Sequence, residues 1–238
     1  MTKISVIIPT LNEAARIDNA INSAIGSDPA ERSRDQCEVE IIVSDANSTD
    51  ETRSIASELG ACVVQSPPGR GEQMDYGASV STGELLLFLH ADSTLPELWH
   101  KDVLNTLKDP KVSAGAFTLS IDARGWRYRI LEYFSKLRAK HLGLIYGDQA
   151  IFTTTESFDD VGGFEKLPLF EDVDYVMKLK RIGKVSLIDK KVITSPRRWE
   201  KDGLIRNTLR NWFLLSLFML GFNTRGLYKR YYKSPLTR

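Results

Sequence analysis

Cysteine and histidine are scarce in this sequence, which argues against a cysteine metal site and against a histidine-rich one. The 238 residues include two cysteines, Cys37 and Cys62, and three histidines. The cysteines lie far apart and outside any metal-binding spacing, so we predict two reduced thiols in a cytoplasmic protein. Three histidines are too few for a histidine-rich metal site.

Long hydrophobic runs are also missing. The longest, residues 212–222, has 11 residues, including one serine and one glycine. As a helix it would reach about 16 Å, whereas a bilayer core is about 30 Å thick. The N-terminal apolar run, residues 4–8, is followed at once by Pro9, Asn12 and Glu13. We therefore expect no single membrane span and no signal peptide.

Acidic residues are nearly missing from the C-terminal quarter, although the net charge of the chain is only +1. Residues 176–238 hold 16 Lys and Arg but 3 Asp and Glu, which leaves 16 basic and 28 acidic residues for the rest. An acidic body with a basic C-terminal quarter predicts an anionic partner for that quarter. Nucleic acid, an anionic membrane surface and substrate phosphates all fit this charge.

The first 110 residues alternate between apolar runs and helical patterns. Apolar runs typical of strands cover residues 3–9, 39–44, 61–65 and 85–89. Helical patterns cover residues 12–25, 48–59, 72–81 and 96–107. We expect Ser48 or Thr49 to cap the second helix. Four successive strand–helix units predict a parallel sheet with helices on both faces.

The loops that follow these strands carry the polar residues of the predicted site. Right-handed crossovers place all four loops at one edge of the sheet, and ligands of such sheets bind just beyond that edge. The loops hold residues 9–13 (PTLNE), 45–47 (DAN), 69–71 (GRG) and Asp92. A carboxylate at the end of a buried strand, as Asp92 is, can hold a hard metal ion against a phosphate. This edge therefore predicts an enzyme that handles a nucleotide diphosphate.

The second half of the chain is less regular. We expect strands over residues 113–121, 149–154 and 185–188, and helices over residues 126–140, 172–182 and 203–222. The helix over residues 126–140 is amphipathic and rich in Arg, Lys and aromatic residues. Gly162 and Gly163 predict a turn within residues 158–164.

Several short motifs follow one another along the chain. They are residues 5–13 (SVIIPTLNE), 43–50 (VSDANSTD), 69–71 (GRG), 90–92 (HAD), 161–164 (VGGF), 170–174 (FEDVD) and 197–199 (RRW). In this order they resemble the motifs of glycosyltransferase family 2, over about residues 3–200. The resemblance implies an α/β GT-A (nucleotide-diphospho-sugar transferase) fold, with a mainly parallel central sheet flanked by helices and a C-terminal helical extension.

The resemblance also implies how the chain is divided. Residues 1–200 would form the glycosyltransferase domain, with a nucleotide-sugar-binding half over residues 1–110 and an acceptor half over residues 111–200. Residues 201–238 would follow as an amphipathic helix and a basic tail.

His90 departs from the family pattern. The family's Asp-x-Asp motif usually begins with an aspartate at the position that His90 occupies here. We expect Asp92 to bind a divalent cation, Mg²⁺ or Mn²⁺, and His90 to be a second ligand or a phosphate contact. The alternatives are a loop aspartate that caps the next helix and a histidine that is packed beside the site.

The donor-binding residues are predicted in the first half. We expect the nucleotide-sugar to contact Pro9, Thr10, Glu13, Asp45, Asn47, Arg70, Ala91 and Asp92. The glycines beside Arg70 let the backbone approach a ligand closely, and its guanidinium can clamp a phosphate. Simple local roles stay open: a turn cap for Asp45, helix-start residues for Thr10 and Glu13, and a solvated turn for Arg70.

The catalytic residues are predicted in the second half. The resemblance makes Asp172 the general base, and Glu171 would orient it or touch the acceptor. A sugar hydroxyl is a poor nucleophile until its proton is taken in the transition state. The alternative is an acidic first turn that the helix dipole favours. Further contacts with the acceptor or the diphosphate are predicted for Asp148, Gln149, Arg197, Arg198 and Trp199.

These residues predict an inverting glycosyltransferase that moves a sugar from a nucleotide-diphosphate donor to the hydroxyl of a lipid or glycan acceptor. A sugar-nucleotide pyrophosphorylase is an alternative, but it needs a Gly-rich loop with Arg and Lys where this chain has residues 9–14 (PTLNEA). A non-catalytic nucleotide-binding module is another. Nucleic acid is not predicted as a partner, because it would leave the acidic loop edge without a role.

The helix over residues 203–222 has two interpretations. Its apolar face holds Leu204, Leu209, Phe213, Leu217 and Leu220. The helix either packs in the core or in a homodimer, or lies in the plane of a membrane. The membrane alternative is supported by the basic and tyrosine residues that follow: Arg225, Tyr228, Lys229, Arg230, Tyr231 and Tyr232. This second interpretation predicts peripheral contact with the inner face of the membrane through residues 203–233.

Overall fold

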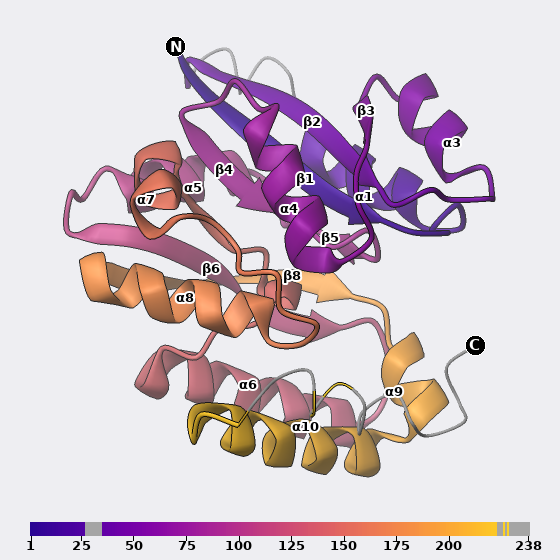
Figure 1. Cartoon of the computed structure of the whole chain (residues 1–238), viewed down its shortest axis with the longest axis vertical. Helices are drawn as coiled ribbons and strands as arrows, with labels where there is room; N and C mark the ends of the chain where they lie inside the picture. Colours follow the sequence, from indigo (N-terminus) through magenta and orange to yellow (C-terminus); the bar gives the residue numbers. More distant parts are fainter. Residues whose placement is uncertain (27–34, 223–225, 227, 229–238) are drawn as a thin grey trace.

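A central eight-stranded sheet organises the molecule, as a computed structural model shows for residues 1–26, 35–222, 226 and 228 (Figure 1). The strands are β1 (Thr2–Thr10), β2 (Cys37–Asp45), β3 (Cys62–Gln65), β4 (Leu85–Phe88), β5 (Ser93–Thr94), β6 (Val112–Ile121), β7 (Phe152–Thr154) and β8 (Lys184–Thr194). Their order across the sheet is β3-β2-β1-β4-β7-β6-β8-β5. The first four strands along this order run parallel, which confirms the strand–helix alternation predicted for the first half.

Helices cover both faces of the sheet. They are α1 (Ile17–Ile25), α3 (Thr52–Glu58), α4 (Arg70–Ser79), α5 (Trp99–Leu107), α6 (Trp126–Leu142), α7 (Thr155–Val161), α8 (Glu171–Ile182), α9 (Arg197–Asp202) and α10 (Leu204–Met219). Because alternate strand residues point to opposite faces, Leu85 and Leu87 of β4 pack with α1, α3 and α5. Leu86 and Phe88 pack with α4, α6, α7 and α8 on the other face. The continuous apolar run of β4 is thus explained by burial on both sides.

Strands β7 and β5 are antiparallel exceptions. β7 lies between β4 and β6 and is antiparallel to both, and β5 is antiparallel to β8. Gly115 of β6 lies opposite Phe152 of β7. A Cβ on Gly115 would lie 2.2 Å from Phe152 Cζ, so the aromatic ring occupies the space that a side chain would need.

The helix predicted from residue 12 begins at Ile17 instead. The backbone N–H of Asn12 donates to Ser48 Oγ and that of Glu13 donates to Thr52 Oγ1, both at 2.8 Å. These long-range bonds hold the chain after β1 against the loop after β2, so that helical hydrogen bonding starts later. Neither Ser48 nor Thr49 caps α3, which begins at Thr52.

Other element predictions also need correction. Helix α7 was not predicted, although Thr154 caps it by accepting a hydrogen bond from Ser157 N at 3.0 Å. The strand predicted over residues 149–154 is a 3-10 turn, η1 (Gly147–Gln149), followed by the three-residue β7. Helix α9 contains the Arg197-Arg198-Trp199 motif, for which no helix was predicted.

Helices α6 and α10 lie side by side at the end of the molecule opposite β1, β2 and β3 (Figure 1). Phe134 of α6 meets Trp212 of α10 edge to face, with the ring centroids 6.3 Å apart. Within the described residues, no helix has the length and apolarity needed to cross a bilayer. Several residues of the predicted membrane contact lie outside the described residues: Arg225, Lys229, Arg230, Tyr231 and Tyr232.

Candidate active site

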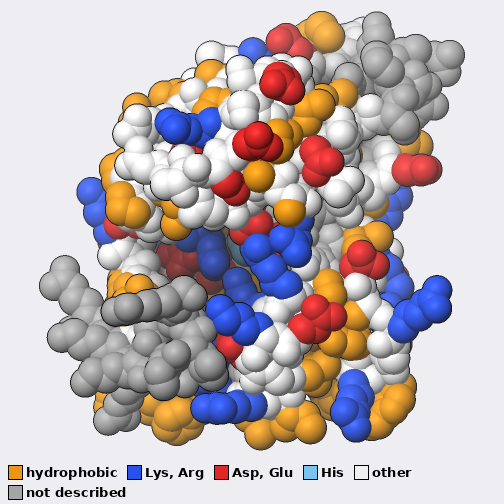
Figure 2. Space-filling model, turned by 90° about the vertical axis from the view of Figure 1, so that its right-hand side faces the viewer, with side chains coloured by type: hydrophobic (Ala, Val, Ile, Leu, Met, Phe, Trp, Pro, Cys, Tyr) orange, Lys and Arg blue, Asp and Glu red, His pale blue; other side chains and the backbone are white. Residues whose placement is uncertain are grey.

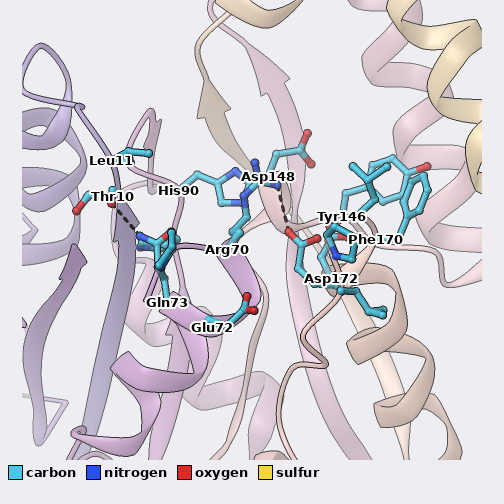
Figure 3. Close-up of a pocket in the computed structure, with 18 of the residues that line it drawn as sticks. Thr10, Leu11, Arg70, Glu72, Gln73, His90, Tyr146, Asp148, Phe170 and Asp172 are labelled. Carbon is cyan, nitrogen blue, oxygen red and sulfur yellow. Dashed lines mark hydrogen bonds and ion pairs between the residues drawn. The ribbon is translucent and has the colours of Figure 1, made fainter. Parts of the chain in front are cut away.

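A pocket of about 960 Å³ opens beyond the carboxyl ends of β1 and β4 and is closed on its other side by the start of α8. Figure 2 shows charged side chains of both signs around this hollow, between the upper and lower parts of the molecule. Figure 3 places Thr10 and Gln73 on one side, Tyr146 and Asp172 on the other, and His90 between them. Both halves of the chain therefore contribute to one cavity.

The pocket brings together twelve of the sixteen predicted site residues. They are Pro9, Thr10, Glu13, Arg70, His90, Ala91, Asp92, Asp148, Glu171, Asp172, Arg197 and Arg198. The other four, Asp45, Asn47, Gln149 and Trp199, are not among the lining residues. The sequence thus indicated the correct edge of the sheet, whereas the roles of these residues stay predictions.

The strand register explains why the first-half residues meet. Ile7 of β1 pairs with Phe88 of β4, so the loop with Asp92 emerges beside Pro9 and Thr10. Gln73 of α4 fixes this edge from behind, because its Nε2 donates to the carbonyls of Thr10 and Ser44, each at 2.8 Å. Gln73 also lines the pocket. No sequence pattern singled it out, since its role depends on two strands that are distant along the chain.

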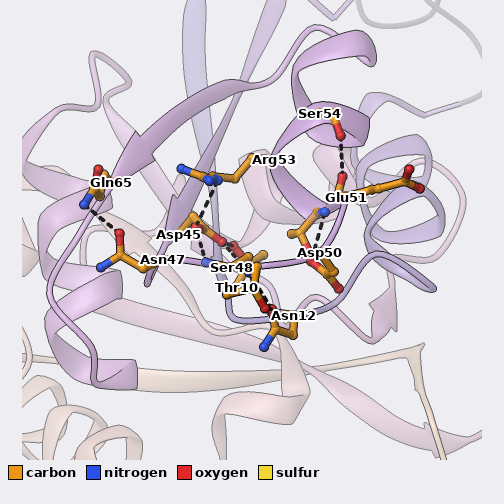
Figure 4. Close-up of polar contacts among 12 residues, drawn as sticks. Thr10, Asn12, Asp45, Asn47, Ser48, Asp50, Glu51, Arg53, Ser54 and Gln65 are labelled. Atoms are coloured by element: carbon orange, nitrogen blue, oxygen red, sulfur yellow. Dashed lines mark hydrogen bonds and ion pairs between the residues drawn. The ribbon is translucent and has the colours of Figure 1, made fainter.

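Asp45 is fully buried and holds the loops rather than facing the pocket (Figure 4). Its Oδ1 accepts a hydrogen bond from Ser48 N at 2.8 Å, and its Oδ2 accepts one from Thr10 Oγ1 at 3.0 Å. Asn47 Oδ1 accepts a bond from Gln65 Nε2 at 2.6 Å. This geometry corresponds to the turn-cap alternative for Asp45, which acts on the pocket through Thr10.

Glu13 and Asp92 converge on one cationic group. The Arg197 guanidinium of α9 forms an ion pair with Glu13 and lies 3.4 Å from Asp92 Oδ2. Glu13 Oε2 is buried and has no hydrogen-bond partner among the described residues. The two carboxylates therefore create a place that suits positive charge, and this is an oxygen donor set that Mg²⁺ or Mn²⁺ accepts.

No complete metal cage is formed in the described part of the chain, where no three His, Cys, Asp or Glu side chains gather as ligands. Mg²⁺ commonly needs only one or two protein carboxylates when substrate phosphates and water complete its shell. The residues present fit such an ion, with Asp92 and Glu13 as protein carboxylates.

His90 sits in the pocket wall as a neutral imidazole. Burial lowers the pKa of His90 well below its usual range, and the charges of Arg70 and Arg198 lower it further. Its Nε2 is buried and has no hydrogen-bond partner among the described residues. A Cβ on Gly147 would lie 2.8 Å from this nitrogen. The absence of a side chain on Gly147 thus leaves free space beside His90 Nε2.

Asp172 lies in the first turn of α8, directly across Gly147 from His90. Its Oδ2 accepts a hydrogen bond from Gly147 N at 2.6 Å, and its Oδ1 accepts one from Val173 N at 2.8 Å. The same Cβ position on Gly147 would lie 3.3 Å from Asp172 Oδ2. Two backbone donors therefore fix the carboxylate in one orientation at the pocket wall.

Glu171 connects the two halves of the pocket. Its carboxylate is buried and lies 3.3 Å from Arg70 Nη1, which comes from the start of α4. Burial raises the pKa of Glu171, and the Arg70 charge opposes this effect. The ion pair fixes α8 relative to α4, which fits a positioning role as well as a direct one.

Asp148 is a further carboxylate that lines the pocket, close to Asp172. Burial raises the pKa of Asp148. The charges of Arg138 and Arg198 oppose this effect, and those of Asp172 and Asp92 add to it. Its Oδ1 is buried without a hydrogen-bond partner among the described residues. The ionised form is therefore costly, unless a ligand donates a hydrogen bond to it.

We expect Asp148→Asn to stabilise the free protein at neutral pH, because the neutral amide removes the burial penalty of the carboxylate. For a domain of this size, a gain of ~1 kcal/mol would raise Tm by about 2–4 °C. A raised folded-state pKa means that the gain is full above that pKa and shrinks as pH falls through it. It should vanish below the unfolded value of about 3.9. Thermal unfolding from pH 4 to pH 8 measures this, and a pH-independent difference would contradict it.

Two predicted contacts take other positions. Gln149 is fully buried, and its Nε2 donates to the carbonyl of Phe117 at 3.1 Å. Trp199 is half-buried in α9. Tyr146 was not predicted, yet it lines the pocket, and Arg138 of α6 lies over its ring at 3.4 Å from the centroid. This contact spans η1 and α6, so neither local motif could indicate it.

Comparison with known proteins agrees with this geometry. The sequence profile described as Glycosyl transferase family 2 matches residues 5–164. A Rickettsia conorii protein described as an uncharacterized glycosyltransferase is 29% identical over 221 residues, which is 85% of this chain and 35% of that protein. A Rickettsia felis protein with the same description is 40% identical over 96 residues, 40% of this chain and 30% of its own length. The chain thus spans about a third of the length of these relatives.

Solved structures share the fold at lower sequence identity. S. aureus TarS 1–349 in complex with UDP-GlcNAc superposes with a TM-score of 0.61 and 22% identity, covering 82% of this chain and 58% of that one. Glucosyl-3-phosphoglycerate synthase from Mycobacterium tuberculosis, in complex with Mn²⁺, UDP and phosphoglyceric acid, gives a TM-score of 0.59 at 20% identity. The match covers 80% of this chain and 69% of that one.

Proposed function

This chain belongs to glycosyl transferase family 2, and from that premise we propose that it transfers a sugar from a nucleotide-diphosphate donor to an acceptor hydroxyl, with inversion at the anomeric carbon. The predicted GT-A fold is confirmed by the structural neighbours. One observation carries the proposal. Asp92, beyond β4, and Asp172, in the first turn of α8, line the same pocket. Family membership also favours this reaction over the pyrophosphorylase alternative.

The donor binds in the half formed by residues 1–110. Three arginines line the pocket, Arg70 from this half and Arg197 and Arg198 from the other, and planar guanidinium groups suit bidentate contacts with phosphate oxygens. The crystal structures of S. aureus TarS 1–349 with UDP and with UDP-GlcNAc support a nucleoside diphosphate as the leaving group. Thr10 and Glu13 lie at the same edge and face the remainder of the nucleotide.

A divalent cation at Glu13 and Asp92 would offset the charge that develops on the leaving diphosphate. The Mn²⁺ that accompanies UDP in the glucosyl-3-phosphoglycerate synthase complex supports a cation in this fold. Arg197 now lies between these two carboxylates. When the donor is bound, its guanidinium can turn to the phosphates, which carry the larger negative charge. His90 Nε2 then remains as a neutral contact for the donor or the ion.

Asp172 acts as the general base. The acceptor hydroxyl approaches the anomeric carbon from the face opposite the diphosphate, and Asp172 takes its proton as the new bond forms. Its carboxylate is ready for this role because Gly147 N and Val173 N hold it in place. Glu171 positions the start of α8 through Arg70. Asp148, with an unpaired buried oxygen, binds a hydroxyl of the acceptor.

The acceptor half comprises residues 111–200, and the acceptor is the hydroxyl of a lipid or a glycan. Asn211 of α10 and Tyr228 also line the pocket, although both lie beyond this half. Two described residues of the C-terminal segment therefore take part in the site. Two proposals remain for the partner of this segment: a membrane surface, which residues 203–233 would contact, or a second copy of the chain in a homodimer.

A ligand screen tests the proposal directly. The protein is heated with nucleotide-diphosphate sugars, with and without Mn²⁺, and the products are analysed for free nucleoside diphosphate. A donor at about 100 times its Kd should stabilise the fold by ~2.7 kcal/mol, or about 5–10 °C in Tm. The matching nucleoside without phosphates is the control and should give little shift. A full panel without binding or hydrolysis at millimolar concentration would contradict the proposal.

A further inference from the structure

Helix α6 carries an exposed apolar stripe on the side that faces away from the sheet. Ser135 and Ala139 are buried on its inner side. Its large exposed side chains recur at helical spacing, at Trp126, Ile130, Tyr133, Phe134 and Leu137, and Leu142 is exposed at its C-terminal end. Trp126 is 68% exposed. Water-exposed apolar residues at this spacing are the pattern of a helix face that docks on something apolar.

Helix α10 carries a second stripe of the same kind. Asn207, Leu214 and Leu215 are its buried residues. The exposed face holds Ile205, Leu209, Trp212, Phe213 and Met219. The core-helix interpretation of residues 203–222 therefore accounts for only part of this helix, because half of the ten large apolar side chains of α10 are exposed.

The two stripes form one surface. Phe134 of α6 and Trp212 of α10 are in ring contact, and Figure 2 shows hydrophobic side chains along the lower edge of the molecule, where both helices lie. In the described part of the chain there are 21 exposed large hydrophobic residues, and 13 of them fall within residues 126–142 and 204–222. Such concentration marks an interaction site, because isolated exposed hydrophobic residues would be scattered.

The charge carried by α6 and α10 themselves has almost one sign. Asp189 and Asp202, from neighbouring elements, each pair with one of their cations. Helices α6 and α10 contain seven Lys and Arg and a single acidic residue, Glu132, which is buried. Arg127, Lys140 and Arg206 are exposed and form no ion pair within the residues that the structure describes. The sequence continues in the same way, since residues 220–238 hold five Lys and Arg and no Asp or Glu.

We propose that the α6/α10 surface docks on the headgroup region of an anionic phospholipid bilayer. Apolar stripes with tryptophan and tyrosine enter the interface, and the flanking cations meet the lipid phosphates. A second copy of this chain fits the surface less well. A symmetric dimer through this face would bring the unpaired cations of one copy against those of the other, with no acidic residue of either stripe to oppose them.

This surface deepens the function proposed above, on which the following step rests. Asn211 and Tyr228 line the pocket from the C-terminal segment, and Phe170, beside Glu171, packs on Phe218 of α10 at 5.3 Å between ring centroids. The acceptor side of the pocket is thus built onto the docking surface. A bilayer bound there presents its own hydroxyl-bearing components to Asp172, so the acceptor is a membrane-borne hydroxyl.

Vesicle binding tests the docking surface without any transfer assay. The protein is floated with vesicles of phosphatidylglycerol and phosphatidylcholine in equal parts, and with phosphatidylcholine alone, at low and high salt. We expect binding to the anionic vesicles that weakens with salt, together with a blue shift of tryptophan fluorescence from Trp126 and Trp212. The double variant Trp126→Ser/Leu209→Ser should bind the anionic vesicles at least about tenfold more weakly than the parent protein. The matched control, Tyr76→Ser/Val80→Ser, changes two exposed apolar residues of the donor half and should bind as the parent does.

The outcomes separate this inference from the proposed function. Thermal stabilisation by the nucleotide-sugar should be unchanged in the Trp126→Ser/Leu209→Ser variant, because neither residue lines the pocket. Absence of binding to anionic vesicles would overturn the docking surface while leaving the donor site intact. So would equal binding to neutral vesicles, or a dimer in sedimentation that the double variant dissociates, since the surface would then have another occupant.

Discussion

Asp172→Asn should lower the rate of sugar transfer by about 10²–10⁴-fold, the usual contribution of a general base, and leave donor binding intact. Asparagine keeps the shape of the side chain but cannot accept the proton of the acceptor hydroxyl. The proposed role places this carboxylate at the acceptor, so the Tm increase that the nucleotide-sugar produces should be the same in the variant and the parent. Transfer rates at saturating donor, together with the thermal shift, measure the two effects separately.

Asp174→Asn is the matched control for this variant. Asp174 lies in the same first turn of α8 and pairs with Lys178 at 3.3 Å, but it does not line the pocket. If Asp172 only interacted favourably with the helix dipole, both variants would lose similar, small amounts of stability and would keep full activity. Retained transfer in Asp172→Asn together with lost transfer in Asp148→Asn would assign the base to Asp148, the other carboxylate on that wall.

The sequence predicted the parts of this site that local patterns determine. Asp92 was recognised because the unbroken apolar run over residues 85–89 ends just before the His90-Ala91-Asp92 motif. Asp172 was recognised because it begins a helix within a motif that resembles those of the family. The edge where they meet followed from the rule that parallel strands present their carboxyl ends at one side of the sheet. The structure brings both residues to one pocket.

The parts that were missed depend on contacts between distant segments. Gln73 joins the ends of β1 and β2 through two hydrogen bonds, and a single glutamine in a helix gives no sign of this. Asp45 was predicted to contact the donor; in the structure its buried carboxylate accepts hydrogen bonds from Ser48 and Thr10, contacts that depend on the loops around it, and the donor contact stays a prediction. The surface shared by α6 and α10 was half predicted, because the helix over residues 126–140 was recognised as amphipathic without any sign that α10 lies beside it.

Asp92→Asn should lower transfer by about 10²–10³-fold, a loss typical of removing one group that stabilises developing charge. The amide retains one oxygen but loses the negative charge that attracts a cation. Glu13 would then be the one remaining carboxylate of the pair that converges on Arg197. We therefore expect the variant to need much more Mn²⁺ for its residual activity. A titration of transfer rate with Mn²⁺, and of Mn²⁺ binding by electron paramagnetic resonance with nucleoside diphosphate present, gives both quantities.

Glu72→Gln is a suitable comparison for Asp92→Asn, because Glu72 also lines the pocket but lies at the start of α4. Its loss removes one negative charge from the pocket without touching the pair formed by Glu13 and Asp92. If both variants require more Mn²⁺ to the same extent, the general charge of the pocket attracts the ion and Asp92 does not bind it. If Asp92→Asn keeps full activity in the presence of a chelator, Arg197 itself neutralises the departing diphosphate. His90, which also lines the pocket, would then belong to a site that relies on arginine in place of a metal.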